Sequence, residues 1–411
     1  MSEIRDISLA PSGEMKIMWA KSNMPVLRGI EAEFMKTKPL AGLRVALSVH
    51  MEAKTAYLCR VMQSAGAEMY VTGCNPLSTQ DDVAAAVAAG GIEIFAWHGS
   101  TPEEYERHLC RVLEPGPNII IDDGGDLVHL MHTKFTHHIP QVIGGCEETT
   151  TGIRRLCSMA AAGSLKFPMV LVNDAMCKHL FDNRYGTGQS VWDGINRTTN
   201  LIVAGKNVVV AGYGWCGKGI AMRAKGLGAK VVITETDPVR ALEGAMDGFD
   251  VMPMNEAAGI GDIFVSSTGC RGVLERRHFE KMKSGAILAN AGHFNVEIDM
   301  DALTEMSVRR YSARANVEGF VLPDGRELFV LAEGRLVNIA AGDGHPVEIM
   351  DMSFAVQALS AKYLAENRGR LSAGVVQVPP DIDEAVARLK LAAMDISIDS
   401  LSDEQKSYLA Q

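Results

Sequence analysis

Three glycines at fixed spacing are the residues of this chain best suited to bind a specific chemical group. Gly212, Gly214 and Gly217 follow the strand-like run 208–210 directly, and a helical stretch continues to about residue 225. In a G-x-G-x-x-G turn, the first glycine permits the tight turn, the second lets the backbone approach a phosphate, and the third lets helix and strand pack closely. Because the helix N-terminus then faces the turn, the segment predicts a binding site for the pyrophosphate of a dinucleotide.

The acidic residue after the next strand indicates which dinucleotide would bind. Glu235 ends the strand-like run that begins at Lys230. A carboxylate at this place accepts hydrogen bonds from the adenosine ribose hydroxyls and repels a 2′-phosphate, so we expect NAD rather than NADP. A glycine-rich turn without a ligand is the alternative. It is less favoured because strand, turn, helix, second strand and acid occur in the expected order.

Strand-like runs alternate with helical stretches along the chain and position these residues. The runs form two series, at 43–49, 68–72, 92–96 and 118–121, and at 208–210, 230–234, 262–265 and 286–289. This alternation predicts an α/β protein with two doubly wound, Rossmann-like domains with parallel sheets, followed by a short helical C-terminal segment. Ligands of such sheets bind beyond the carboxyl ends of the strands, where His50, Asp123 and Asn290 are found.

Composition narrows the class of ligand and the cellular compartment. The 411 residues are 47% hydrophobic and carry a formal net charge of −10, without a run of Lys or Arg, so we expect a small-molecule ligand rather than nucleic acid or a membrane. The absence of a leader-like N-terminus and of a long apolar run predicts a cytoplasmic protein. Its eight cysteines form no C-x-x-C pair, so we expect neither a disulfide framework nor a metal site.

Several longer motifs resemble those of the adenosylhomocysteinase family. They are Asp-Asp-Gly-Gly-Asp at 122–126, Glu-Glu-Thr-Thr-Thr-Gly at 147–152, Val-Asn-Asp at 172–174, Gly-His-Phe-Asn-Val-Glu-Ile-Asp at 292–299 and Gly-His-Pro at 344–346. The resemblance extends in register from about residue 40 to 355. It implies a substrate-binding domain at 1–180, an NAD-binding domain at 181–345, a second part of the substrate-binding domain at 346–376, and a C-terminal helical segment at 377–411 that contacts another subunit of a homo-oligomer, either a tetramer or a dimer.

The resemblance also implies a reaction, the hydrolysis of a nucleoside thioether. The ribose 3′-hydroxyl is oxidised by NAD, the C4′ proton becomes acidic, the thiol leaves, water adds, and the ketone is reduced again, so that the cofactor is recycled. Lys178 and Asp182 would face the 3′-hydroxyl from one side of a helical turn, and we expect a neighbouring cation and partial burial to lower the pKa of Lys178. The residues that the resemblance places in catalysis are His50, Asp123, Glu148, Lys178, Asp182 and His293. Those that it places at the cofactor or the closing of the cleft, in addition to Gly212, Gly214 and Gly217 of the glycine turn, are Thr149, Thr150, Thr151, Asn183, Glu235, Asn290, Asn338 and His345.

Two residues depart from the family where it contacts the purine. Glu52 and Lys54 stand where most members have threonine and a glutamate or glutamine. An ionised Glu only accepts hydrogen bonds and a Lys ammonium only donates them, so the pair suits hypoxanthine, with its N1–H and O6, better than adenine. Together with His345 at the base, this predicts S-inosyl-L-homocysteine as substrate. The alternatives are that Glu52 and Lys54 pair with each other, and that the substrate is S-adenosyl-L-homocysteine.

The C-terminal sequence bears on how tightly NAD is held, and two other functions remain as alternatives. The chain ends at Ser-Tyr-Leu-Ala-Gln where most members carry a Lys-Pro-Asp-His-Tyr-Arg-Tyr arm, so we expect looser retention of NAD. A catalytically silent NAD-binding regulator is less favoured because all the proton-transfer positions are filled. A simple dehydrogenase would release NADH during turnover, which a recycled cofactor does not.

Overall fold

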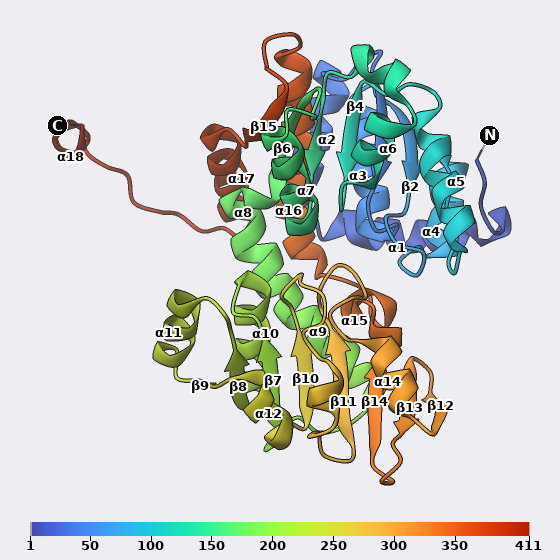
Figure 1. Ribbon diagram of the computed structural model, residues 1–411. Coiled ribbons are helices and arrows are strands. Elements are labelled where there is room, and N and C mark those ends of the chain that lie inside the picture. The colour runs from blue at the N-terminus through green and yellow to red at the C-terminus, as the bar shows by residue number, and fades with distance from the viewer. Residues whose placement is uncertain (1, 411) are drawn as a thin grey trace.

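The computed structural model describes residues 2–410, which form two α/β bodies (Figure 1). The first contains a seven-stranded sheet in the order β15-β6-β5-β4-β1-β2-β3, and all its pairs are parallel. Its strands are β1 (Arg44–Ser48), β2 (Glu68–Thr72), β3 (Glu93–Ile94), β4 (Ile119–Asp122), β5 (Gly144–Glu147), β6 (Pro168–Leu171) and β15 (Gly374–Gln377).

The second body contains an eight-stranded sheet in the order β12-β13-β14-β11-β10-β7-β8-β9. This sheet is mixed, because β13 pairs with β12 and with β14 in antiparallel fashion, whereas the sequence predicted a parallel sheet only. The antiparallel strands join by short turns and carry no helix between them. Its strands are β7 (Asn207–Ala211), β8 (Lys230–Thr234), β9 (Asp250–Val251), β10 (Ile263–Ser266), β11 (Ala286–Asn290), β12 (Arg309–Arg314), β13 (Val317–Val321) and β14 (Glu327–Leu331).

Helices cover both faces of each sheet because successive strand residues point to opposite faces. Val45 and Leu47 of β1 belong to one core cluster and Ala46 to another. In β7, likewise, Val208 and Val210 belong to one cluster and Val209 to another. The helices of the first body are α1 (Ala10–Ser22), α2 (Pro25–Thr37), α3 (Ala53–Ser64), α4 (Asp81–Ala89), α5 (Pro102–Leu113), α6 (Asp126–Thr133), α7 (Thr150–Ala161), α16 (Val347–Glu366) and α17 (Pro380–Ala393). Those of the second are α10 (Trp215–Gly226), α11 (Pro238–Met246), α12 (Met254–Ile260), α13 (Arg276–Phe279), α14 (Met300–Met306) and α15 (Val337–Ala340).

Both sheets change direction at one point, and those points locate the ligand clefts. In the first sheet the chain runs from β1 outward to β3 and then returns to place β4 on the other side of β1. In the second it runs from β7 outward to β9 and returns to place β10 beside β7. Crevices open at the carboxyl ends of strands on either side of such a reversal. The fold therefore directs attention to the residues after β1 and β4, and after β7 and β10.

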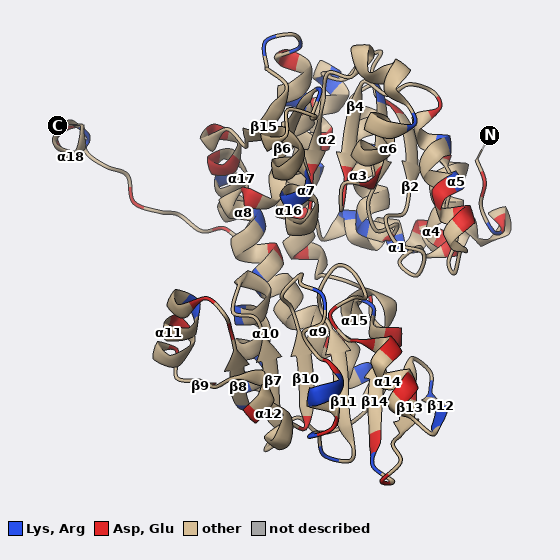
Figure 2. Cartoon of the chain, in the orientation of Figure 1, with Lys and Arg blue, Asp and Glu red and all other residues tan. Residues whose placement is uncertain are grey.

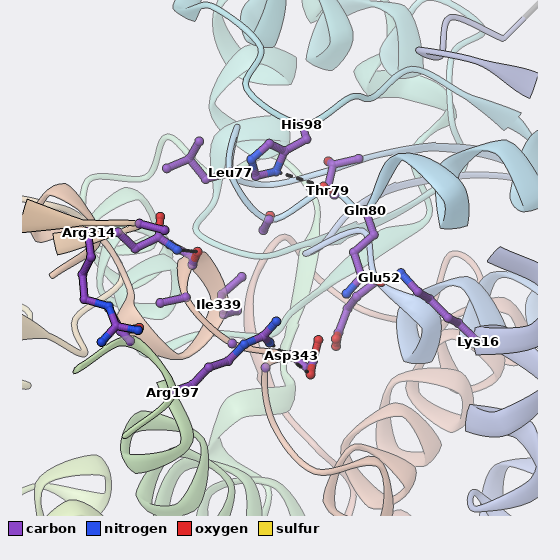
Figure 3. Close-up of a pocket in the computed structure, with 18 residues that line it drawn as sticks. Lys16, Glu52, Leu77, Thr79, Gln80, His98, Arg197, Arg314, Ile339 and Asp343 are labelled. Atoms are coloured by element: carbon purple, nitrogen blue, oxygen red, sulfur yellow. Dashed lines mark hydrogen bonds and ion pairs between the residues drawn. The ribbon is translucent and has the colours of Figure 1, made fainter. Parts of the chain in front are cut away.

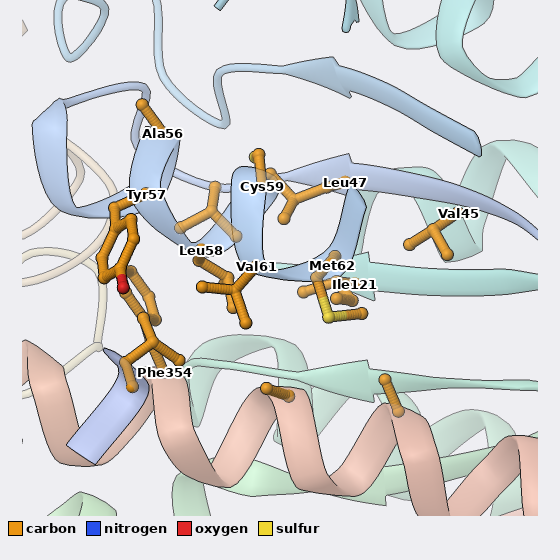
Figure 4. Packing of buried hydrophobic residues seen from close by; sticks show 14 of the residues in the cluster. Val45, Leu47, Ala56, Tyr57, Leu58, Cys59, Val61, Met62, Ile121 and Phe354 are labelled. Atoms are coloured by element: carbon orange, nitrogen blue, oxygen red, sulfur yellow. The ribbon is translucent and has the colours of Figure 1, made fainter. Parts of the chain in front are cut away.

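A continuous helical run connects the two bodies. It consists of α8 (Met176–Lys178), a π-helical stretch η4 (His179–Gly186) and α9 (Thr187–Thr199). A π-helical stretch inside a helix is uncommon and occurs frequently at functional sites. The return passes from α15 into α16, whose Phe354 lies beside Tyr57 of α3 in the main core of the first body (Figure 4).

The C-terminal part of the chain belongs more closely to the first body than the sequence indicated. Strand β15, which was not predicted, pairs with β6 and spans the proposed boundary at 376/377. Helix α17 packs against α16 and α2, and its Val386 is fully buried. Only α18 (Asp403–Leu409) lies apart, at the end of an extended segment (Figure 1).

Charged residues of both signs are spread over the helices and loops, and the strands carry few of them (Figure 2). Among residues 2–410, no helix combines the length and the apolar character needed to cross a bilayer.

Candidate active site

Three predicted catalytic residues follow neighbouring strands of the first sheet. Ser48 pairs with Asp122, and Asp122 pairs with Glu147, so the ends of β1, β4 and β5 are level. His50, Asp123 and Glu148 lie one or two residues beyond these ends and line one cavity of about 120 Å³. The register of the sheet therefore brings together side chains that lie almost 100 residues apart in the sequence.

Lys178 lies at the centre of a buried polar network. Its Nζ is 3.1 Å from Oδ2 of Asp182 and 3.5 Å from Oε1 of Glu148. It also donates a hydrogen bond to Oδ1 of Asn183 at 2.9 Å. The four-residue spacing of Lys178 and Asp182 does place both on one side of the helical run, as the sequence predicted.

The charges around Lys178 contradict one prediction from the sequence, that the pKa of this residue is lowered. Burial alone would lower the pKa of Lys178, but Asp182 and Glu148 outweigh it and raise that pKa above its ordinary value. The prediction of a lowered pKa is therefore wrong for this structure, because the neighbours of the ammonium are two carboxylates rather than a cation. Burial would likewise raise the pKa of Asp182, but Lys178 and His345 hold it far below its usual range.

Helix α16 supplies partners for both carboxylates. Ser353 Oγ donates to Oδ2 of Asp182 at 2.9 Å, and Gln357 Nε2 donates to Oε2 of Glu148 at 2.5 Å. His345 Nδ1 also bonds Asp182 Oδ1, while its Nε2 is 3.2 Å from Thr187 Oγ1. Burial raises the pKa of Glu148 to about 8, although Lys178 acts in the opposite direction. Glu148 is thus a carboxyl group that can gain and lose a proton near neutral pH.

A second, looser cluster surrounds Asp123. Its Oδ2 lies 3.6 Å from Nε2 of His50, and its Oδ1 lies 3.9 Å from Nδ1 of His293. The Cys74 thiol donates to Asp123 Oδ2 at 3.1 Å and is 3.3 Å from Nδ1 of His50. Burial lowers the pKa of His50 to about 4, so its imidazole is neutral at pH 7. The cluster therefore holds a neutral imidazole against a carboxylate, which is an arrangement suited to proton transfer.

Three residues of this cluster are close enough to coordinate one metal ion. The ligand atoms of His50, Cys74 and Asp123 lie within 4.8 Å of one another. The sequence predicted no metal, and this cluster is where that prediction should be tested.

The two residues that depart from the family pattern are Glu52, which lines the cavity, and Lys54, which contacts Glu52. Oε2 of Glu52 is 2.6 Å from Lys54 Nζ. Lys54 also donates to the carbonyl oxygens of Asp343 and His345, each at 2.8 Å. The pairing of Glu52 with Lys54 that the sequence left open as an alternative is therefore present, and together with the two carbonyl contacts it engages all three hydrogens of the ammonium.

A larger cavity of about 430 Å³ lies beside Glu52 (Figure 3). Glu52 and Ile339 line both cavities. Lys16, at its edge, is already bonded to Gln80 and Asp82. We take the smaller cavity as the active site because the buried titratable groups are found there.

The glycine turn has the close approaches that its spacing predicted. Gly212 has a φ of +93°, and a Cβ on Gly217 would lie 1.9 Å from the carbonyl oxygen of Gly212. Gly214 is the N-cap of α10, and a Cβ there would meet only Arg240 Nη1, at 3.8 Å. The turn thus leaves room for an anion at the helix N-terminus.

Other predicted cofactor residues fit an NAD site to different degrees. Glu235 accepts hydrogen bonds from the backbone N–H groups of Tyr213 and Thr236, at 2.7 and 2.6 Å. Burial alone would raise the pKa of Glu235, but these bonds outweigh it and keep it low, so the group stays ionised. Asn338 Oδ1 is buried and has no hydrogen-bond partner among the described residues, while Asn338 lines the cavity. This unused acceptor is what a bound ligand with an amide or hydroxyl donor requires.

Some predicted residues are not at the cavity wall. Thr149 and Asn183 line it, whereas Thr150, Thr151 and Asn290 do not. Asn290 donates to the carbonyls of Phe294 and Gly334, at 2.9 Å each, and so fixes the loop that carries His293. Thr150 accepts a hydrogen bond from Asn173. The predicted cofactor contacts of these three residues remain predictions.

Sequence reasoning missed Cys74, Ser353 and Gln357. Cys74 has no motif around it that would separate it from other buried cysteines. Ser353 and Gln357 are polar residues four apart in the apolar helix α16, and that spacing could have indicated a shared functional face.

Comparison with known proteins agrees with this geometry. Residues 1–136 match the family model for S-adenosyl-L-homocysteine hydrolase, and residues 183–344 match the model for its NAD-binding domain. The chain is 57% identical to the S-inosyl-L-homocysteine hydrolase of Methanococcus maripaludis, over 100% of this chain and 99% of that one. It is 56% identical to the adenosylhomocysteinase of Thermococcus kodakarensis, over 99% and 96% of the two chains.

A distant solved structure shares only the fold. A dipicolinate synthase chain of Bacillus halodurans is 14% identical, with a TM-score of 0.50 over 80% of this chain and 99% of that one. The family models, the two relatives and the site geometry agree on an enzyme that uses NAD. The chain belongs to the S-adenosyl-L-homocysteine hydrolase family.

Proposed function

We propose that this enzyme hydrolyses S-inosyl-L-homocysteine to inosine and L-homocysteine, reversibly. The observation that carries the choice of base is the position of Glu52, whose carboxylate lines the active-site cavity with Lys54 at 2.6 Å. An ionised carboxylate accepts a hydrogen bond from N1–H of hypoxanthine but has no donor for N1 of adenine. Relatives of both names are about equally similar to the chain, so overall identity does not choose between the substrates.

Lys54 supports this reading indirectly. Because its three hydrogens are used by Glu52, Asp343 and His345, it would have to exchange one of them to reach O6 of the base. In the present arrangement it favours the ionised form of Glu52, while burial acts in the other direction and raises the pKa of that group. We therefore assign Glu52 as the direct contact to the purine and keep the Lys54–O6 contact as a prediction.

The cluster around Lys178 acts at the 3′-hydroxyl of the ribose. The cofactor that Gly212, Gly214, Gly217, Glu235 and Asn338 would hold supplies hydride transfer at C3′. The raised pKa of Lys178 makes its ammonium a group that polarises the 3′-oxygen, and Glu148, with a pKa of about 8, is the carboxylate best able to take the hydroxyl proton. Asp182 stays ionised and holds Lys178 in place.

The cluster around Asp123 serves C4′ and C5′. Asp123 is the base for the C4′ proton, and the neutral His50 beside it can carry a proton to or from the 5′ position. His293 approaches Asp123 from the second body, so this cluster is complete only when the two bodies face each other. The assembly into a homo-oligomer, as a dimer or tetramer, and a cytoplasmic location belong to this proposal and rest on the family alone.

The test compares the two thioethers on one protein. We expect kcat/KM for S-inosyl-L-homocysteine to exceed that for S-adenosyl-L-homocysteine, since a mispaired buried polar group costs about 1 to 3 kcal/mol, or roughly 5- to 150-fold. The released nucleoside is measured by chromatography. Equal or faster hydrolysis of the adenosyl compound would overturn the choice of base and leave the family assignment intact.

A substitution at Glu52 sharpens this test. Glu52→Gln should bring the two kcat/KM values close together, because an amide can either accept from N1–H or donate to N1. Glu33→Gln is the matched control, since Glu33 is a surface carboxylate paired with Lys362, and it should leave the preference unchanged. For the unmodified protein, the preference for the inosyl compound should weaken as the pH falls, because the raised pKa of Glu52 makes protonation easier and a protonated carboxyl can donate to adenine N1.

A further inference from the structure

A carboxylate from helix α17 caps the turn that carries Lys178. Asp383 of α17 accepts hydrogen bonds from the backbone N–H groups of Met176, at 2.5 Å, and Cys177, at 2.7 Å. In return, the Cys177 thiol donates to the backbone carbonyl of Asp383 at 3.3 Å. The two segments are more than 200 residues apart in the sequence, so this contact exists only in the folded protein.

The cap replaces one that the local sequence does not provide. The N-cap position of α8 is Ala175, whose side chain has no acceptor. The first N–H groups of a helix have no partner within the helix and need one from elsewhere. Asp383 supplies that partner, and its negative charge is favourable at a helix N-terminus.

Helix α17 is itself anchored to the elements that hold the other active-site carboxylates. Val386 is buried in the main core of the first body. Lys390 donates to the carbonyl of Glu348, at 3.0 Å, and to Oδ2 of Asp351, at 3.1 Å, both in α16. The same α16 bears Ser353 and Gln357, the partners of Asp182 and Glu148. Helix α17 therefore connects the turn of Lys178 with α16, the helix that supplies hydrogen-bond donors to Asp182 and Glu148.

We propose that Asp383 is a positioning residue for Lys178, which lies one residue beyond the two N–H groups that it caps. The inference rests on the proposed function, in which Lys178 acts at the 3′-oxygen. If the cap is lost, the first turn of the helical run 176–199 loosens. Lys178 then moves relative to Glu148, whose position is fixed separately by the end of β5. A misplacement of about 1 Å at a reacting group can cost on the order of 100-fold in rate. The C-terminal segment thus contributes to catalysis within its own chain, in addition to any contact with another subunit.

The test uses the full-length protein with bound cofactor and three variants. Asp383→Ala removes the cap, and Asp383→Asn keeps one acceptor oxygen. Glu384→Gln is the matched control, because Glu384 is the next residue on α17 and its partner Arg388 is equally exposed. We expect Asp383→Ala to lower kcat by about 10- to 100-fold with KM changed less than about threefold. Asp383→Asn should lie between Asp383→Ala and the unmodified protein, and Glu384→Gln should not differ from the latter.

Two measurements separate positioning from a general loss of structure. Amide hydrogen exchange of residues 176–183 should accelerate in Asp383→Ala and stay unchanged in Glu384→Gln. This exchange is read without turnover, so it remains informative if the proposed substrate is wrong. A kcat for Asp383→Ala within about twofold of the unmodified protein, unchanged exchange, or an equal loss in Glu384→Gln would overturn the inference. If Asp383→Ala does not fold, Asp383→Asn decides by the same criteria.

Discussion

The two polar clusters of the active site differ in how completely their atoms are bonded. Around Lys178, both carboxylates have a hydrogen-bond donor from α16, and the ammonium has an amide oxygen at 2.9 Å and carboxylate oxygens at 3.1 and 3.5 Å. Around Asp123, the two imidazoles stand off at 3.6 and 3.9 Å, and one thiol provides the short contact. Groups that hold fixed charges need full solvation by the protein, whereas groups that pass protons need an acceptor that is not already used.

The first cluster is therefore suited to the 3′-oxygen, where Lys178 and Asp182 hold charge and Glu148 accepts a proton, and the second is suited to proton transfer at C4′ and C5′. In the first cluster, the ammonium of Lys178 has a raised pKa because it lies between the carboxylates of Asp182 and Glu148. The second has an imidazole whose pKa is lowered to about 4, so that it is an uncharged base at pH 7. Substitutions should therefore affect different steps of the reaction.

The largest effect is expected at Lys178. Lys178→Met should slow the first step, the reduction of bound cofactor by substrate, by about 100- to 10,000-fold, because the 3′-oxygen loses its polarising charge and Asp182 and Glu148 lose their counter-ion. The absorbance of the reduced nicotinamide reports this step directly. Lys178→Arg keeps the charge and serves as the control for it. Rapid cofactor reduction in Lys178→Met would contradict the assignment of the Lys178 cluster to the 3′-oxygen.

Asp123→Asn should separate the clusters most clearly. We expect release of homocysteine to fall by about 100-fold or more, while reduction of bound cofactor stays within about tenfold. The variant would then accumulate reduced cofactor without releasing thiol, and both quantities can be followed in the same reaction. If both fall together, Asp123 belongs functionally to the first cluster.

The ionisation of Glu148 should appear in the pH profile of the first step. Because burial raises the pKa of Glu148 to about 8, the carboxylate form that accepts a proton becomes more abundant as the pH rises through that value. The rate of cofactor reduction should therefore increase between about pH 6 and 9. Glu148→Gln should flatten the profile and lower the plateau, and a profile unchanged by this substitution would contradict the assignment.

The smallest effect is expected at Cys74. Cys74→Ala removes the hydrogen bond from its thiol to Asp123, and a single net hydrogen bond of about 1 kcal/mol corresponds to roughly fivefold in the rate of thiol release. Cys74→Ser keeps a donor and should remain close to the unmodified protein. If both variants are equally slow, the thiol has a role other than donating to Asp123.

Several features of this enzyme could be predicted from the sequence because they are local. The turn at Gly212, Gly214 and Gly217, and the acid at Glu235, lie within one strand-turn-helix-strand segment, and the structure gives the turn the expected geometry. Lys178 and Asp182 are four residues apart in one helical run, and the structure shows the contact that this spacing predicted. By contrast, β5, with the sequence Gly-Gly-Cys-Glu, has none of the β-branched residues that mark a strand, and it is recognised only because β4 and β6 pair with it.

The direction of the pKa shift of Lys178 could not be predicted from the sequence. Lys178 was expected to have a lowered pKa, and its raised pKa follows from Glu148, which the sheet brings in from β5, and from Asp182. The pairing of Lys54 with two backbone carbonyls likewise depends on the segment 343–345 returning to α3 after almost 300 residues.

The sequence by itself determined the residue types available for chemistry, the dinucleotide turn and the family, because each depends on side chains that are near one another along the chain. The tertiary structure decided which charges meet: Lys178 with Glu148, His293 with Asp123, and Asp383 with the turn of Lys178. The physical reason is that electrostatic interactions and desolvation depend on distance in space and on burial, and both are set by the pairing of strands and the packing of helices rather than by position in the sequence.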